Sequence, residues 1–335
     1  MAGIFRKAGK SAVILFCFVL AAVGLVYFVV TRETAEPVVA AVSKNPYIMP
    51  VGSPLVAAHR SGGGLFPENT LNAFERCVNS DDFRTDIFEF DLHLTKDDVL
   101  VVLHDGTLDR TSDAVEYFGK KDIRASDYSF AELRALNMGE NYVAPDGSRP
   151  YAGLRGKDIP ENLRVVRVEE VFDFLEKHGK FSYIIDIKDG GERGKRATDV
   201  FYAILSEKKL LGRVFAASFH GEINRYQHEA YPDMMRSAGP KEVLKIYLYS
   251  LFGISAEPGT FTFDALQIPD DSYVINLATT RFINYAHKHD IAVQYWTIND
   301  EEKMNSLKEK GADAIITDLP DVAYALVHEQ AAAKR

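Results

Sequence analysis

Two carboxylates, Glu89 and Asp91, are spaced two residues apart within an otherwise largely apolar run, Asp86–Leu94. The pattern of this run predicts a β-strand, and side chains two apart on a strand point to the same face. Two like charges that point into a protein interior repel each other unless a cation lies between them. Mg²⁺ and Ca²⁺ prefer oxygen ligands, so the pair predicts a hard divalent ion as cofactor. The alternative is an exposed strand face that carries salt bridges.

A histidine, His104, follows the next predicted strand, Val99–Leu103. The intervening residues predict a tight turn, so the two strands form a hairpin in which Leu92 lies opposite Val102. His104 then returns beside the carboxylate pair. An imidazole there is suited to act as a general acid or base near neutral pH, and the alternative is a structural histidine that caps the hairpin.

A third dense stretch runs from His59 to Thr70 and reads His-Arg-Ser-Gly-Gly-Gly-Leu-Phe-Pro-Glu-Asn-Thr. Arg60 has the planar, forked guanidinium that binds two phosphate oxygens at once. The glycines would let the backbone approach a ligand, although a plain flexible loop has the same composition. Thr70 is a candidate N-cap for the following helix. Glu68 is compatible with two roles, a metal ligand or a first-turn helix charge.

Apolar runs typical of strands alternate with helical patterns along the chain. If the second strand of the hairpin, Val99–Leu103, is not counted, they form eight units of a strand followed by a helix. Their strands begin near residues 55, 86, 181, 214, 234, 263, 291 and 314, and the run at Met234–Ser237 is the weakest. Eight such units predict a TIM-type (β/α)8 barrel, with an open doubly wound sheet as the alternative. Active residues of a barrel lie where its strands end, and later runs end at Asp186-x-Lys188, Trp296 and Asp318.

The predicted barrel covers residues 55–325, and a long polar stretch at about 106–164 predicts an insertion after the hairpin that could cover a site. Residues 31–54 mix proline, small and charged residues, which predicts a linker. Residues 1–30 form a separate hydrophobic segment, predicted to be an N-terminal helix.

Within that segment, Arg6, Lys7 and Lys10 precede an uncharged apolar run, Ala12–Val30. The run has about 19 residues, enough to span a bilayer as a helix. The basic flank predicts a cytoplasmic N-terminus, with the barrel on the periplasmic or extracellular side of the membrane. The alternative is a cleaved signal segment, which would give a secreted protein.

The net charge of −9, without a long basic run beyond the N-terminus, argues against nucleic acid as a partner. A small phosphorylated substrate is compatible with it, because one metal ion can reverse the field within a pocket. The two cysteines, Cys17 and Cys77, imply no disulfide framework. No obligate protein partner is indicated.

Taken in order, these motifs resemble those of the glycerophosphodiester phosphodiesterase family. The resemblance runs from about residue 55 to 322; each piece is weakly specific, and the ordered set is highly specific. The matching pieces are His59-Arg60, Pro67-Glu68-Asn69-Thr70, Glu89-x-Asp91-x-x-x-Thr95-Lys96-Asp97, His104-Asp105, Asp109-Arg110-Thr111, Lys188, Trp296-Thr297-Ile298-Asn299 and Gly311-Ala-Asp313-x-Ile-Ile-Thr-Asp318-x-Pro320.

The resemblance implies a TIM barrel that hydrolyses glycerophosphodiesters to sn-glycerol 3-phosphate and an alcohol with Ca²⁺ or Mg²⁺. It implies that His59 and His104 are the catalytic acid/base pair and that Glu89 and Asp91 are metal ligands. Asp186 stands where the family usually has a third ligand, a glutamate.

Arg60 and Lys188 would then bind the phosphate, and Trp296 would form an apolar wall for the substrate or pack in the barrel core. A lysophospholipase D that acts on membrane lysolipids is the alternative function for the same site. A degenerate barrel that only binds a ligand is a third class, which the presence of both histidines disfavours.

Overall fold

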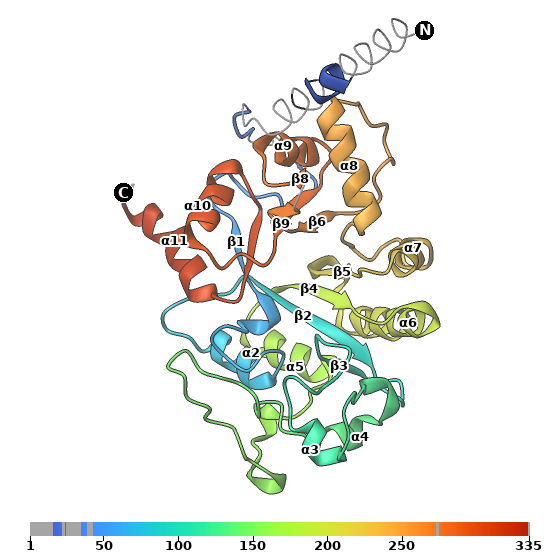
Figure 1. Cartoon of the computed structure of the whole chain (residues 1–335), viewed down its shortest axis with the longest axis vertical. Coiled ribbons are helices and arrows are strands. Elements are labelled where there is room, and N and C mark those ends of the chain that lie inside the picture. The colour runs from blue at the N-terminus through green and yellow to red at the C-terminus, as the bar shows by residue number, and fades with distance from the viewer. Residues whose placement is uncertain (1–15, 22–23, 25–34, 39–42, 273–274, 334–335) are drawn as a thin grey trace, which may run out of the picture.

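The computed structural model describes residues 16–21, 24, 35–38, 43–272 and 275–333. Its centre is a nearly closed barrel of seven parallel strands, surrounded by helices, in the order β5-β4-β2-β1-β10-β9-β6 (Figure 1). The predicted TIM-type barrel is therefore confirmed. The strands are β1 (Leu55–Ala58), β2 (Ile87–Leu94), β3 (Leu100–Val102), β4 (Ser182–Ile187), β5 (Val214–Ala217), β6 (Ala265–Ile268), β7 (Asp271–Ser272), β8 (Ile275–Asn276), β9 (Ala292–Tyr295) and β10 (Ala314–Thr317).

Helices follow the barrel strands and cover their outer faces (Figure 1). Thr70 begins the first of them as predicted, because its hydroxyl accepts the Ala73 N–H. The α-helices are α2 (Leu71–Val78), α3 (Ala114–Phe118), α4 (Phe130–Leu133), α5 (Val168–His178), α6 (Gly191–Lys208), α7 (Gly221–Ala230), α8 (Pro240–Phe252), α9 (Thr280–Lys288), α10 (Glu301–Lys310) and α11 (Pro320–Ala333).

The strand predicted at Met234–Ser237 is reduced to two isolated parallel bridges. Arg236 pairs with Ala216 of β5, and Ser237 pairs with Ala265 of β6, so these two residues fill the gap between the edge strands. The segment is too short for a ladder because Gly239 caps α8 directly afterwards. The barrel thus closes through seven strands and a bridging segment.

The two faces of β2 pack as the alternation predicts. Phe88, Phe90 and Leu92 are fully buried in a cluster with α2 and α5. Opposite them, Glu89 and Asp91 point into the barrel and line its cavity. Apolar burial on one side of the strand therefore fixes the direction of both carboxylates on the other.

The barrel interior is filled at its N-terminal end by an apolar cluster that includes Ile87, Ile184 and Phe215. Tyr47, from the segment predicted to be a linker, completes this cluster and packs edge-on against Phe215. The backbone N–H of Met49 donates to Asp313 Oδ1 at 2.7 Å. Residues 43–49 therefore belong to the packed base of the barrel.

The hairpin has the predicted register, with Leu92 opposite Val102. The residues between β3 and α5 carry α3, α4 and several 3-10 turns, packed on a separate apolar cluster around Leu133 and Leu136. Within the described residues, no helix is both long and apolar enough to cross a membrane. Most of the predicted membrane-spanning run, Ala12–Val30, lies outside the described residues.

Candidate active site

Strand register brings the predicted residues to one end of the barrel. Asp91 of β2 and Asp186 of β4 are direct partners across the sheet. Ala58 pairs with Phe88, so His59 follows β1 beside Glu89. A cavity of about 410 Å³ opens there, and its walls include all eight residues predicted for the site: His59, Arg60, Glu89, Asp91, His104, Asp186, Lys188 and Trp296.

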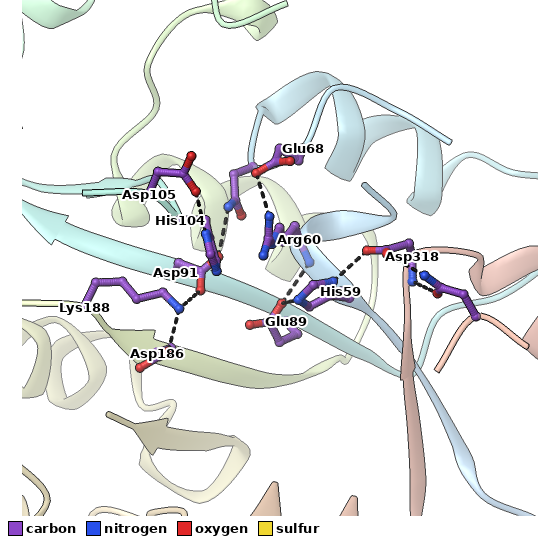
Figure 2. A network of polar contacts seen from close by, with 12 residues as sticks. His59, Arg60, Glu68, Glu89, Asp91, His104, Asp105, Asp186, Lys188 and Asp318 are labelled. Atoms are coloured by element: carbon purple, nitrogen blue, oxygen red, sulfur yellow. Dashed lines mark hydrogen bonds and ion pairs between the residues drawn. The ribbon is translucent and has the colours of Figure 1, made fainter. Parts of the chain in front are cut away.

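His59 lies between two carboxylates (Figure 2). Its Nδ1 is 2.6 Å from Asp318 Oδ1, and its Nε2 is 3.9 Å from Glu89 Oε2. Burial lowers the pKa of His59, but the charge of Glu89 and the hydrogen bond to Asp318 outweigh burial, so the pKa is raised above 6.5. Asp318 is itself fixed, because the Asn299 side-chain amide donates to its Oδ2 at 2.7 Å.

His104 has an equivalent partner on its own loop. Its Nδ1 is 2.7 Å from Asp105 Oδ1, and Arg110 donates from Nε to Asp105 Oδ2 at 2.6 Å. Arg110 and His104 together hold the pKa of Asp105 well below its usual value, against the effect of burial. Both candidate histidines therefore use Nδ1 to bind an aspartate, which leaves Nε2 of each ring for other contacts.

The two carboxylates of β2, Glu89 and Asp91, have pKa values that are shifted in opposite directions. Burial, reinforced by the charge of Asp91, raises the pKa of Glu89 to about 7. Burial acts on Asp91 in the same direction, but Lys188 and His104 hold the pKa of Asp91 below its usual value. Repulsion between two close carboxylates is the expected origin of such a difference.

The Lys188 side chain links β2 to β4 by binding a carboxylate on each strand (Figure 2). Its Nζ lies 2.8 Å from Asp91 Oδ1 and 2.7 Å from Asp186 Oδ2. Although burial lowers the pKa of Lys188, the two carboxylates raise it well above its usual value, so the ammonium stays charged. The pKa of Asp186 is raised, mainly by burial.

The loop after β1 reaches the site through unusual backbone angles. Arg60, Ser61 and Asn69 have φ values of 48°, 63° and 58°, in the left-handed region that costs energy for residues with side chains. This backbone aims the Arg60 N–H at Glu89 Oε2, 2.8 Å away. The Asn69 side-chain amide donates to Asp91 Oδ2 at 3.0 Å. The strained loop therefore holds one oxygen of each β2 carboxylate.

The glycines of this loop serve packing as well as turning. A Cβ on Gly64 would lie 2.9 Å from the Asp318 carbonyl oxygen, and the Gly64 N–H donates to that oxygen at 3.1 Å. Close approach to Asp318, the partner of His59, requires glycine at this position. The structure thus gives Gly64 a packing role in addition to any contact with a ligand.

Glu68 does not line the cavity. It accepts from Arg60 Nη1 at 3.2 Å and from Arg110 Nη2 at 2.7 Å. Its carboxylate therefore links the loop after β1 to the insertion and holds Arg60 at the cavity edge. Glu68 precedes the N-cap Thr70, so it is not a first-turn charge of α2.

The carboxylates have donor chemistry suited to a hard cation. Among the described residues, Asp186 Oδ1 is buried and has no hydrogen-bond partner, and the three carboxylates face one cavity. Unpaired buried carboxylate oxygens are ligands that Ca²⁺ and Mg²⁺ prefer. Lys188 binds the other oxygen of Asp186, Oδ2, and Asp91 Oδ1, and within the described residues no three ligating side chains converge into a ready ligand set. The carboxylates are therefore suitable ligands for a divalent ion, but the Lys188 ammonium already binds two of them.

Apolar side chains also line the cavity. Trp296 contacts Phe219 edge-on, with ring centroids 5.9 Å apart, and Phe219 is 60% exposed. Val243, Ile268 and other apolar side chains are part of the same lining. The Lys188 ammonium lies over the Phe219 ring, with Nζ 5.7 Å from the ring centroid, so charged and apolar groups meet within the cavity.

The sequence did not assign roles to several residues of the site. The sequence places Asp318 at the end of an apolar run and Asp105 within a motif, but it assigns a role to neither of them, nor to Asn69 or Asn299. Asp318 directly follows β10, the last barrel strand, and that position is the available signal. Its pairing with His59 spans 259 residues of chain and required the folded structure.

A barrel that gathers two histidine–aspartate pairs, a lysine and buried carboxylates at the ends of its strands has the groups expected of a phosphoester hydrolase. The model of the Glycerophosphoryl diester phosphodiesterase family matches residues 59–322, and the chain belongs to this family. It is thus an enzyme, a phosphoric diester hydrolase.

Known proteins share most of the chain. It is 28% identical over 321 residues to a glycerophosphodiester phosphodiesterase of Bacillus subtilis (strain 168), covering 93% of this chain and 96% of the relative. It is 25% identical over 289 residues to the lysophospholipase D GDPD3 of Mus musculus, covering 79% of each. A solved Oleispira antarctica phosphodiesterase, in complex with the product sn-glycerol-3-phosphate, has a TM-score of 0.58 at 19% identity, covering 82% of this chain and 97% of that one. This last likeness shows a shared fold.

Proposed function

We propose that the chain hydrolyses glycerophosphodiesters to glycerol 3-phosphate and an alcohol, with His59 and His104 as its acid/base pair. The observation that carries the proposal is that both imidazoles line one cavity and each binds an aspartate through Nδ1. Such bonds set the orientation and tautomer of a ring, leaving Nε2 for proton transfer. Family membership and the product bound to the Oleispira relative support the choice of substrate.

In this proposal, one imidazole takes a proton from the attacking hydroxyl, and the hydroxyl oxygen forms a new bond to phosphorus. The hydroxyl belongs to water or to the substrate's own glycerol; in the second case the product is a cyclic glycerol phosphate, which water then opens to glycerol 3-phosphate. The bond between phosphorus and the alcohol oxygen breaks, and the other imidazole donates a proton to the leaving alkoxide. Arg60 and Lys188 offset the negative charge on the phosphoryl oxygens as it builds.

We also propose that Glu89, Asp91 and Asp186 hold a divalent ion, Ca²⁺ or Mg²⁺. A bound ion would polarise the phosphoryl group and reduce its repulsion of the nucleophile. Support comes from the buried, unpartnered Asp186 Oδ1 and from the raised pKa of Glu89, which burial and Asp91 both favour. A nearby cation would give Asp186 Oδ1 a partner and would lower the pKa of Glu89.

A lysophospholipase D activity on membrane lysolipids is the second candidate. The apolar side chains that line the cavity, Trp296 and Phe219 among them, favour it, because an aliphatic group could pack against them. The similarity to the mouse lysophospholipase D supports the same choice.

We further propose that Ala12–Val30 anchors the chain in a membrane, with the barrel on the periplasmic or extracellular side. The length of this run and the basic residues before it support the proposal. Cleavage of the segment would instead release a secreted enzyme.

A coupled assay tests the catalytic proposal. Glycerol 3-phosphate released from several headgroup diesters is measured with glycerol-3-phosphate dehydrogenase, and lysolipids are assayed in parallel for the released alcohol. His59→Ala and His104→Ala should each lower turnover on the order of 10²–10⁴-fold, the usual range for acid/base groups. Near-normal turnover in both folded variants would place the chemistry elsewhere.

A further inference from the structure

One helix carries an exposed apolar stripe outside the site. On α8, Leu244, Leu248 and Phe252 recur every four residues, and Ile254 follows the helix end. Their exposed fractions are 48%, 40%, 67% and 43%, whereas Ile246 and Tyr247 on the other face are buried. Residues four apart lie on one helix face, so Leu244, Leu248 and Phe252 form an apolar stripe along α8, and the exposed Ile254 follows just beyond its C-terminal end.

The stripe ends beside the point where the N-terminal segment joins the barrel. The Tyr285 hydroxyl of α9 donates to the Ile254 carbonyl oxygen at 2.7 Å. The next residue towards the N-terminus of α9, Asn284, accepts the Val38 N–H at 3.0 Å and donates to the Glu36 carbonyl at 2.8 Å. Figure 1 shows α8 and α9 side by side at one end of the molecule. The apolar stripe and the attachment of the N-terminal segment therefore share one side.

The sequence limits the distance between that attachment and Val30, the last residue of the apolar run. Six residue steps separate Val30 from Glu36, which span at most about 20 Å. If Ala12–Val30 crosses a bilayer, Glu36 and the adjacent end of α8 must lie close to the lipid surface.

The charge of this surface suits lipid headgroups. Lys241 and Lys245 are exposed on α8, and the Lys245 ammonium donates to the Thr260 carbonyl oxygen at 2.9 Å. Glu242 is the only acidic residue between Pro240 and Ile254 in the sequence, and it is paired with Arg236. Apolar side chains flanked by lysines are typical of helices that lie in the membrane interface.

We propose that the stripe formed by Leu244, Leu248 and Phe252, together with Ile254, is a docking surface for a lipid bilayer. The helix lies along the membrane with its apolar side chains among the lipid headgroups and upper acyl chains. The lysines remain at the level of the phosphates.

Docking would also place the cavity mouth at the membrane. Pro240 and Val243, in the first turn of α8, line the cavity, and Leu244 begins the stripe directly after them. Phosphodiesters at the bilayer surface would then lie next to the site. This consequence rests on the proposed hydrolysis, whereas the docking itself does not.

Fluorescence quenching in vesicles tests the docking directly. The full chain carries a single tryptophan, Trp296, so Leu248→Trp in a Trp296→Phe background reports from the stripe alone. Val143→Trp, at an exposed position of the insertion, is the matched control. Both chains are reconstituted into vesicles of equal phosphatidylcholine and phosphatidylglycerol, with or without bromine on the acyl chains. Circular dichroism verifies that they fold.

The tryptophan at position 248 should lose most of its emission in brominated vesicles, and that at position 143 should lose little. Adding Leu244→Glu and Phe252→Glu should restore the emission at position 248. If the emission at position 248 stays unquenched, the proposal is wrong. Red-shifted emission would show that the stripe faces water, and blue-shifted emission would show that the apolar run or a second copy of the chain covers it. The readout does not involve catalysis, so normal quenching together with an inactive unaltered chain, which keeps Trp296, would contradict only the proposed function.

Discussion

The His59–Asp318 pair offers the sharpest test of the proposed chemistry. Asp318→Asn keeps the size and shape of the side chain but removes the charge that faces His59 Nδ1 at 2.6 Å. The new amide can also donate to Nδ1, which would place the remaining proton of a neutral ring on Nε2. Nε2 could then no longer accept a proton from a nucleophile.

The size of the effect follows from the bond. A hydrogen bond between charged groups contributes about 1.5–3 kcal/mol, and this pair is largely shielded from solvent. Each 1.4 kcal/mol corresponds to about a factor of ten, so kcat should fall on the order of 10–10²-fold. An added change of tautomer would take the loss towards ~10⁴-fold. KM should change little if Asp318 does not touch the substrate.

The pH profile distinguishes this mechanism from general damage. Asp318 helps to raise the pKa of His59, so the substitution should move the limb that His59 controls to lower pH. The same shift is expected whether His59 is the acid or the base. Asp318→Glu, which restores a carboxylate, should recover part of the activity.

Stability should change in a defined pH window. The raised pKa of His59 stabilises the fold below 6.5, and this stabilisation is lost as pH rises through the folded value. The pKa of Asp318 is lowered because its bonds to His59 outweigh burial, so its contribution is present above 3.8 and is lost at lower pH. Asp318→Asn should therefore destabilise the fold most between pH 3.8 and pH 6.5, where both contributions are present. Denaturant titrations across this range would measure the loss.

Asp189→Asn is a matched control. Asp189 Oδ1 lies 3.1 Å from His93 Nδ1, in another buried histidine–aspartate pair whose members do not line the cavity. This substitution should lower stability and leave kcat and its pH profile almost unchanged. If Asp318→Asn behaves in the same way, Asp318 is a structural partner, and the assignment of Nε2 as the reactive nitrogen is wrong.

The sequence predicted the parts of the fold that depend on local patterns. Alternation along β2 set the direction of Glu89 and Asp91, and the turn after it set the hairpin register. Met234–Ser237 forms two single bridges and not the predicted strand, because such bridges depend on how the last gap of the barrel closes, which no local sequence pattern shows. Packing of Tyr47 at the barrel base was missed for the same reason, since it depends on contacts with strands distant in sequence.

The site was predictable to the extent that barrel topology places it. Every parallel strand ends on the same side, so the polar residues that end the apolar runs are expected to meet; Asp186, Lys188 and Trp296 line one cavity, and Asp318 binds His59 at its edge. Spacing could not show that Lys188 lies between Asp91 and Asp186, or that Glu68 binds two arginines. Those contacts depend on side-chain reach across separate loops, and they decide how charge is balanced in the site.

Further measurements test other parts of the reasoning. Burial raises the pKa of the Cys77 thiol to about 12, so a thiol reagent at mildly alkaline pH should modify Cys77 only after denaturation; rapid labelling in the native state would contradict this packing. Protease added to intact cells should digest the barrel if Ala12–Val30 holds it outside the cytoplasm, and full protection would reject that orientation. A nitrophenyl ester needs little protonation of its leaving group, so it should rescue the variant that lacks the catalytic acid, either His59→Ala or His104→Ala; rescue of both or neither would contradict distinct roles. EDTA should abolish activity, and added Ca²⁺ or Mg²⁺ should restore it. Asp186→Glu is the most informative change at the proposed metal site, because the longer carboxylate keeps the charge and donor type but alters reach. If residue 186 is a ligand, this variant should stay active with a changed ratio of Ca²⁺ to Mg²⁺ activation, whereas the asparagine variant should need more of either ion. An enzyme that is fully active in EDTA and holds no metal by elemental analysis would leave Lys188 as the partner of these carboxylates.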